Sequence, residues 1–269
     1  MLKDRLSSSP VAVGDNVEIS LEDNGQALIE NVLPRKQFLA RPDKLCPEKS
    51  QVIAANLDQL VIITSTREPK FKTGLVDRFL VSAEKEHLKA IIVINKIDLE
   101  NEEIFRVNVG AWRAIGYEVI FTSAKTGQGL DTLRETLKDK SSALAGHSGV
   151  GKSSLINALQ TGLNLKTGMI SKASGKGVHT TTSVIMYPLD FGGWVIDTPG
   201  LKIFGFSGID KTNLADYFPE ISKLSGKCRF FNCCHISEPD CAVKKAVLTE
   251  KLSESRYQSY KKLWEQMDK

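Results

Sequence analysis

Residues 145–158 read AGHSGVGKSSLINA and contain the pattern G-x-x-x-x-G-K-[ST] in full. This pattern is typical of a loop that binds phosphates and leads into a helix, because its glycines let successive backbone N–H groups curl around the anion. The start of the helix adds a positive dipole at the same place. The preceding run SSALA is short and lacks β-branched residues, so the strand that should precede the loop is poorly indicated.

The residues of this loop are candidates for nucleotide binding. We expect the ammonium group of Lys152 to reach the β- and γ-phosphates, and the hydroxyl of Ser153 to ligand Mg²⁺. His147 also lies in the loop, and we expect its side chain to point away from the phosphates. A glycine-rich turn that matches the pattern by coincidence is the alternative. The candidate residues are Gly146, His147, Ser148, Gly149, Val150, Gly151, Lys152, Ser153 and Ser154.

Two further motifs are candidates for recognition of guanine. NKID at 95–98 follows AIIVI, at the carboxyl end of an expected strand, where ligands bind in sheets of this kind. The Asp98 carboxylate can accept hydrogen bonds from the N1–H and 2-amino groups of guanine, a pair of donors that adenine lacks. TSAK at 122–125 follows EVIF, and its Ala124 N–H can meet guanine O6. Taken alone, NKID is also compatible with an ordinary turn. The candidates are Asn95, Lys96, Asp98, Ser123, Ala124 and Lys125.

Two motifs after the loop are candidates for sensing the γ-phosphate. In DTPG at 197–200, Asp197 suits a water-bridged contact to Mg²⁺ and the Gly200 N–H suits the γ-phosphate. In HTTT at 179–182, Thr180 and Thr181 are nucleotide-binding candidates, and Thr181 is the expected magnesium ligand when the γ-phosphate is present. Together the five motifs predict a protein that binds GTP and GDP with Mg²⁺.

The order of these motifs is unusual, because the two base-reading motifs precede the phosphate loop. From about residue 51 the chain alternates hydrophobic strands with helices, which predicts an α/β fold with a mostly parallel sheet covered on both faces. Neighbours in a parallel sheet need not be neighbours in sequence. A circularly permuted GTPase domain therefore explains the order, with its new ends where the old connection ran.

The first fifty residues have a different pattern. Short β-type runs alternate with turn signals such as Asn24-Gly25, which predicts a small all-β module. Seven Lys/Arg against eight Asp/Glu give this module no basic patch. We expect a β module at 1–50, the permuted GTPase domain at 51–207 and a helical C-terminal domain at 208–269.

The C-terminal segment contains a cluster of metal-binding residue types. The spacing Cys228-x4-Cys233-x-His235-x5-Cys241 gives three sulfurs and one imidazole, a tetrahedral set that zinc favours in structural sites. Cys234 is a spare cysteine, because adjacent cysteines rarely ligate one ion together. Buried thiols in a small helical lobe and an iron–sulfur site are the alternatives. One structural zinc ion would supply stability that so small a core lacks.

Composition limits the remaining possibilities. The net charge is +4 and the pI is about 8.7, which permits an RNA partner without arguing for one. No apolar run approaches the roughly 20 residues that span a bilayer, and the first ten residues lack the apolar stretch of a secretory signal. We therefore expect a cytoplasmic, monomeric protein with no membrane partner.

The chain resembles the ribosome small-subunit-dependent GTPases, the RsgA or YjeQ family. The resemblance rests on VDRFLVSAE, NKIDL, TSAKTGQGL, GHSGVGKSSLIN, HTTT, IDTPGL, YFPE and CRFFNCCHISEPDCAV, in the permuted order. It implies an N-terminal OB-type barrel, a circularly permuted P-loop GTPase domain and a helical zinc-binding domain. It also implies GTP hydrolysis stimulated by the small (30S) ribosomal subunit during its late maturation, with ribosomal RNA contacted by the flanking domains. Members of this family usually have one or two further strands before the segment that matches SPVAVGD, which begins here at residue 9, so we expect either a shortened barrel or an incomplete start.

The expected catalytic residues are Lys152, Ser153 and His179. The position after DTPG is Leu201, which cannot orient an attacking water, so we expect slow intrinsic hydrolysis and activation by a partner. The resemblance favours His179 for that role, although it can equally only shape its loop. The DTPG motif leads directly into the C-terminal segment, which suggests that this segment responds to the γ-phosphate. Two alternative functions stay open: a GTP/GDP-switched RNA-binding scaffold with incidental hydrolysis, and a permuted GTPase of large-subunit assembly.

Overall fold

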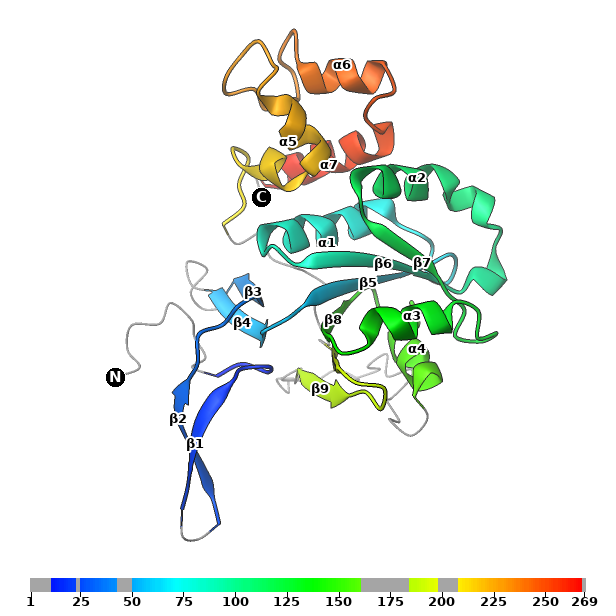
Figure 1. Ribbon diagram of the computed structural model, residues 1–269. Helices are drawn as coiled ribbons and strands as arrows, with labels where there is room; N and C mark the ends of the chain where they lie inside the picture. The colour runs from blue at the N-terminus through cyan, green and yellow to red at the C-terminus, as the bar shows by residue number, and fades with distance from the viewer. Residues whose placement is uncertain (1–10, 23–24, 43–49, 161–183, 198–207, 268–269) are drawn as a thin grey trace, which may run out of the picture.

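The computed structural model describes residues 11–22, 25–42, 50–160, 184–197 and 208–267 (Figure 1). Its centre is a six-stranded sheet in the order β7-β6-β5-β8-β10-β9. All neighbours are parallel except β9, which pairs with β10 in the antiparallel sense. The strands are β5 (Gln59–Ser65), β6 (Lys89–Asn95), β7 (Glu118–Phe121), β8 (Ser141–Ala145), β9 (Ile185–Pro188) and β10 (Trp194–Asp197).

Helices cover both faces of this sheet, as the hydrophobic strands predict. On one face Leu60 and Ile62 pack against α1 and α2, and on the other Val61 and Ile63 pack against α3 and α4. Successive residues of β5 thus point to opposite layers, and every residue of that strand is buried. The helices are α1 (Thr73–Lys85), α2 (Arg106–Ile115), α3 (Leu130–Leu137) and α4 (Lys152–Leu159), with short 3₁₀ turns η1 (Ile97–Leu99) and η2 (Glu102–Phe105).

Strand β8 lies in the middle of the sheet although its sequence, SSALA, has little strand propensity. It is hydrogen-bonded to β5 on one side and to β10 on the other. Ladder bonds on both sides hold β8 extended, and its small side chains fit between two packed layers. The position of β8 also displays the permutation: the strands that precede it in sequence lie on one side of it, in the order β7-β6-β5, and the strands that follow it lie on the other.

The N-terminal β module consists of two hairpins, as far as the described residues show. The first pairs β1 (Val17–Leu21) with β2 (Ala27–Val32), and the second pairs β3 (Phe38–Pro42) with β4 (Ser50–Ala55). A bridge from Val13 to Ala54 links them. The expected boundary at residue 50 falls at the first residue of β4, and the domain limits stay a prediction.

The β1–β2 hairpin projects away from the sheet, at the opposite end of the molecule from α5–α7 (Figure 1). Between residues 17 and 32 its sequence contains four Asp or Glu residues and no Lys or Arg. The exposed residues of the hairpin therefore give it a negative character.

The C-terminal lobe comprises η3 (Leu214–Tyr217), α5 (Pro219–Ser225), α6 (Ala242–Leu248) and α7 (Glu254–Gln266). Its core contains Leu214, Phe218 and Tyr260, and it is continuous with Val81 of α1. The lobe therefore lies on the outer face of α1 (Figure 1). Among the described residues, none of these helices or those of the sheet domain is both long and apolar enough to span a membrane.

Candidate functional site

The sequence motifs on either side of the permutation meet at the carboxyl edge of the sheet, and Asn95 joins them. Its buried side chain donates from Nδ2 to the carbonyl of Val150, at 2.9 Å. Its Oδ1 accepts hydrogen bonds from the Ala124 N–H and the Thr122 hydroxyl, both at 3.3 Å. Asn95 thus ties the phosphate loop, NKID and TSAK together, a role that sequence reasoning did not assign to it.

Two glycines of the phosphate loop are required by its geometry. Gly146 and Gly151 have φ values of +143° and +95°. A side chain at Gly146 would collide with the Ile63 carbonyl, and one at Gly151 would collide with the Asn95 amide. The loop therefore approaches the neighbouring strands as closely as backbone alone permits, and these two positions require glycine.

The loop directs cationic and polar groups toward its centre. Lys152, the first residue of α4, donates from Nζ to the carbonyls of Gly146 and His147, at 2.9 and 3.2 Å. Ser153 follows it and is half-buried, while Ser154 is exposed. Val150 is buried in the core and anchors the loop. A flexible ammonium group that now reaches loop carbonyls is chemically suited to bridging phosphate oxygens instead.

The base-reading motifs also fix one another. Asp98 Oδ1 accepts a hydrogen bond from the Ser123 hydroxyl at 2.6 Å, and Ser123 Oγ in turn accepts from the Thr126 N–H at 3.2 Å. Lys96 adopts a left-handed conformation, with φ of 64°, and its ammonium donates to the Glu68 carbonyl. The carboxylate of Asp98 and the backbone of TSAK therefore lie side by side, as recognition of one edge of a planar base requires.

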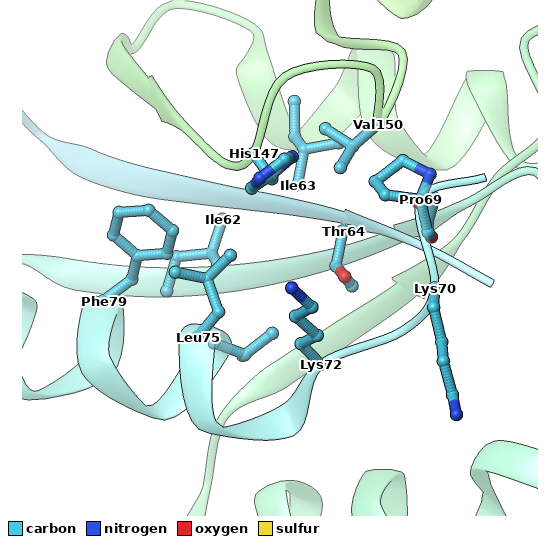
Figure 2. A pocket seen from close by; sticks show the side chains of 12 residues that line it. Ile62, Ile63, Thr64, Pro69, Lys70, Lys72, Leu75, Phe79, His147 and Val150 are labelled. Atoms are coloured by element: carbon cyan, nitrogen blue, oxygen red, sulfur yellow. The ribbon is translucent and has the colours of Figure 1, made fainter. Parts of the chain in front are cut away.

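A small cavity of about 20 Å³ lies between the phosphate loop and α1 (Figure 2). Leu75 and Phe79 of α1 line its apolar side, and the His147 ring lies above them. His147 Nδ1 is 2.8 Å from the Ser148 carbonyl, so the ring is held by its own loop. The structure thus places His147 on the side of the loop that faces α1.

The switch motifs are described only in part. Asp197 ends β10 and is half-buried. The predicted residues His179, Thr180, Thr181 and Gly200, like Leu201, lie outside the described residues. Their expected roles stay predictions.

The predicted metal ligands of the C-terminal lobe converge on one point. The ligand atoms of Cys228, Cys233, His235 and Cys241 all lie within 4.8 Å of one another. Cys228 Sγ and Cys241 Sγ are 3.9 Å apart and lie 3.5 and 3.4 Å from His235 Nδ1. Zinc–sulfur bonds of about 2.3 Å in a tetrahedron place two sulfurs about 3.8 Å apart, so these residues fit a tetrahedral zinc ion.

Groups outside the cluster orient His235 for this role. Its Nδ1 faces the sulfurs, its Nε2 lies 3.0 Å from the Ser225 hydroxyl, and its carbonyl accepts from the Tyr257 hydroxyl at 2.7 Å. Burial lowers the pKa of His235, which favours the neutral imidazole that binds metals. Burial raises the pKa of the Cys233 thiol to about 12, so binding of an ion there releases protons.

Cys234 lies outside this group, as its spacing predicts. Its sulfur is 3.8 Å from the Asn232 carbonyl, while its backbone N–H donates to the carboxylate of Glu238 at 2.7 Å. The same carboxylate accepts the N–H groups of Ile236 and Ser237. Glu238 therefore holds the backbone around His235 in place.

A buried ion cluster joins the lobe to the sheet domain, and no sequence pattern predicts it. Arg256 of α7 donates from Nη1 to Asp77 of α1 at 2.6 Å and from Nε to Glu220 of α5 at 2.7 Å. Asp77 also accepts from the indole N–H of Trp112 in α2, at 2.8 Å. The side chains of Arg256 and Asp77 are each only 1% exposed. Four helices therefore share one desolvated charge cluster.

Comparison with known proteins agrees with this arrangement. The model of the RsgA GTPase family matches residues 32–207. The small ribosomal subunit biogenesis GTPase RsgA of Bacteroides fragilis is 44% identical over 262 residues, which are 96% of this chain and 84% of that protein. Its counterpart in Chlorobaculum tepidum is 45% identical over 261 residues, with 94% and 84% covered.

Two solved structures are similar over nearly the whole chain. YjeQ from Thermotoga maritima aligns with a TM-score of 0.75 at 38% identity, covering 96% of this chain and 84% of that one. YloQ, described as a circularly permuted GTPase, aligns with a TM-score of 0.73 at 32% identity, covering 95% and 80%. The family match, the curated relatives and the permuted sheet agree, and this chain belongs to the RsgA GTPase family.

Proposed function

We propose that this GTPase is activated by the small ribosomal subunit and acts in late maturation of that subunit. The observation that carries the proposal is the junction at Asn95, which assembles the base-reading and phosphate-binding motifs in permuted order, in a chain that also carries a Cys₃His cluster. The curated relatives bear the name small ribosomal subunit biogenesis GTPase, which supports the choice of partner.

In this proposal the phosphate loop and the helix start of α4 bind the phosphates of GTP. Lys152 neutralises charge on the β- and γ-phosphates, and Ser153 with Thr181 holds Mg²⁺, which spreads the charge that develops during phosphoryl transfer. Asp197 and Gly200 complete the γ-phosphate site. His179 orients the attacking water, and the alternative for this residue is that it only shapes its loop. The Cys₃His cluster holds one zinc ion of structural function.

Turnover of GTP with and without purified small subunits tests the proposal. We expect slow turnover by the protein alone and much faster turnover with small subunits, with no comparable effect of large subunits. Equal rates would support the alternative, a nucleotide-switched RNA-binding scaffold whose hydrolysis is incidental. Stimulation by large subunits instead would point to a role in their assembly.

Lys152→Ala is expected to lower stimulated turnover about 100- to 1000-fold, because it removes a cation aimed at the developing charge. Stimulated turnover under saturating GTP measures the effect. Lys138→Ala is the matched control, since Lys138 is exposed after the last turn of α3, away from the loop. Loss of turnover in both variants would show that the assay reports general damage.

Asp98→Asn is expected to weaken GTP binding about 10- to 150-fold, because two hydrogen bonds to a carboxylate are disturbed. The Ser123 hydroxyl can still donate to the asparagine oxygen, so the side chain keeps its place. Its new NH₂ group suits the 2-oxo group of xanthine, and we expect affinity for xanthosine triphosphate to rise. Competition binding measures both. Asp131→Asn, an exposed carboxylate in α3, should change neither affinity, and an unchanged base preference in Asp98→Asn would contradict the assignment.

A further inference from the structure

The C-terminal lobe displays an aromatic side chain at the tip of a tight turn. Between the ligands Cys228 and Cys233 the chain reverses, and the Cys233 N–H donates to the Phe230 carbonyl at 3.3 Å. Phe231 and Asn232 occupy the tip of this turn. The exposed fraction of Phe231 is 107%, so nothing in the described part of the chain covers it, and Phe230 is 39% exposed.

The turn is held at both ends, so the exposure of Phe231 is built into the lobe. Cys228 and Cys233 belong to the Cys₃His cluster, and the Cys228 N–H also donates to the Ser225 carbonyl at 3.3 Å. A phenylalanine ring that stays exposed to water does not contribute the favourable free energy of burying its apolar surface. A ring carried on an anchored turn is suited to stacking, because the backbone is already ordered and only the two side-chain torsions of the phenylalanine lose freedom when a flat partner binds.

The charge around the turn identifies the partner. Residues 221–232 include Lys223, Lys227 and Arg229 and no Asp or Glu. The Arg229 guanidinium lies 5.6 Å from the centre of the Phe230 ring. Its ion pair with Asp240, at 2.9 Å, joins side chains that are 64% and 66% exposed, so a phosphate group can replace that carboxylate at little cost. Glu238, the other nearby carboxylate, is turned toward its own backbone.

We propose that Phe231 stacks on an unpaired RNA base while Arg229 and Lys227 bind the adjoining phosphates. Proteins that bind single-stranded nucleic acid combine these two features, an aromatic face for a base and cations for the backbone. An apolar pocket on a protein is the competing occupant, but it gains nothing from three flanking cations. The inference deepens the proposed function and rests on it for the identity of the RNA, which on the small subunit would be ribosomal RNA.

Three substitutions of Phe231 separate stacking from general hydrophobic contact. Binding is measured to three probes. The first is purified small subunits, the second is a short fluorescein-labelled single-stranded RNA of mixed sequence, and the third is a duplex RNA that contains the same sequence. We expect Phe231→Ala to weaken binding of both subunits and single strand about five- to 150-fold. Phe231→Leu should lose as much, because it has no π face, and Phe231→Trp should bind as tightly as the wild type. Leu248→Ala, another exposed apolar residue of the lobe, should have no effect.

Each outcome decides for or against the proposal. Unchanged binding by Phe231→Ala, or full binding by Phe231→Leu, overturns it, and the second result indicates an apolar protein pocket. Equal loss on duplex and single strand also overturns it, because bases of a duplex are already stacked. Zinc content and GDP affinity should stay at wild-type values in every variant. If small subunits fail to bind or activate the wild type, the proposed function fails, while the single-strand assay still tests Phe231 on its own.

Discussion

Removing the zinc ion that we propose for the Cys₃His cluster is expected to unfold the C-terminal lobe while the sheet domain stays folded. Residues 226–241, which carry all four ligands, contain no helix or strand. The cluster therefore organises this segment, and Cys241 belongs to the core of the lobe. Structural zinc contributes about 10–16 kcal/mol of apparent free energy in small domains, which matches or exceeds the whole stability of a domain of about 5–15 kcal/mol.

Chelation and Cys241→Ser are the two ways to make this change. Hydrogen exchange should show loss of protection in α5, α6 and α7, with protection retained in β5 and β6, and bound zinc should fall from one ion per chain to none. The chelator should act faster at lower pH, because protons compete for the thiolates. Cys234→Ser is the matched control and should keep both zinc and protection, since its sulfur is not among the clustered ligand atoms and contacts the Asn232 carbonyl instead. A lobe that keeps its protection after losing the ion would contradict the expectation.

Arg256→Met is expected to destabilise the contact between the lobe and the sheet domain by about 3–5 kcal/mol. The substitution keeps much of the side-chain volume but leaves Asp77 buried, with the Trp112 indole N–H as its remaining hydrogen-bond donor among the described residues. An ionised carboxylate without its cationic partner carries an uncompensated desolvation cost. Glu220 should suffer less, because its side chain is 16% exposed and can be rehydrated. The guanidinium also lies 4.6 Å from the centre of the Phe218 ring, so some packing is lost as well.

Denaturant unfolding and hydrogen exchange in α1 and α7 measure this effect. Arg106→Met is the matched control: its ion pair with Glu103 joins side chains that are 78% and 68% exposed, so stability should change by less than about 0.5 kcal/mol. The double variant Asp77→Asn with Arg256→Met should recover part of the loss, because it removes the buried charge. A similar loss of unfolding free energy in Arg256→Met and Arg106→Met would contradict the view that burial makes the Arg256 ion pair important for stability.

Features that depend on local spacing could be predicted from the sequence. The phosphate loop, NKID, TSAK and the four metal ligands are each defined by residues a few positions apart, and the structure brings each set together. Their order predicted a circularly permuted GTPase domain, and the chain belongs to a family that includes a structure described as one. The strand SSALA was poorly indicated because ladder bonds from two distant strands, rather than its own residues, hold it extended.

Features that depend on contacts between distant segments could not be predicted. Arg256 and Asp77 are 179 positions apart, and each belongs to an amphipathic helix in which a charged residue normally faces water. The motif of Asn95 predicts a base contact, but it gave no sign that the side chain also bridges loops 27 to 55 positions away. The exposure of Phe231 could not be predicted from the sequence, since an aromatic residue near two cysteines is equally compatible with a buried core position.

The acidic β1–β2 hairpin affects how the molecule is oriented when it approaches a large polyanion. It stands at the opposite end from the C-terminal lobe, whose sequence from residue 211 onward has eleven Lys/Arg against eight Asp/Glu (Figure 1). Opposite charge at two ends makes the molecule an electric dipole. Near any large polyanion it is turned until its positive end leads, before a single specific contact exists. Salt at physiological concentration screens this interaction beyond about 8 Å. The molecule is therefore oriented by the polyanion only during the final approach, and not while it diffuses at larger distances.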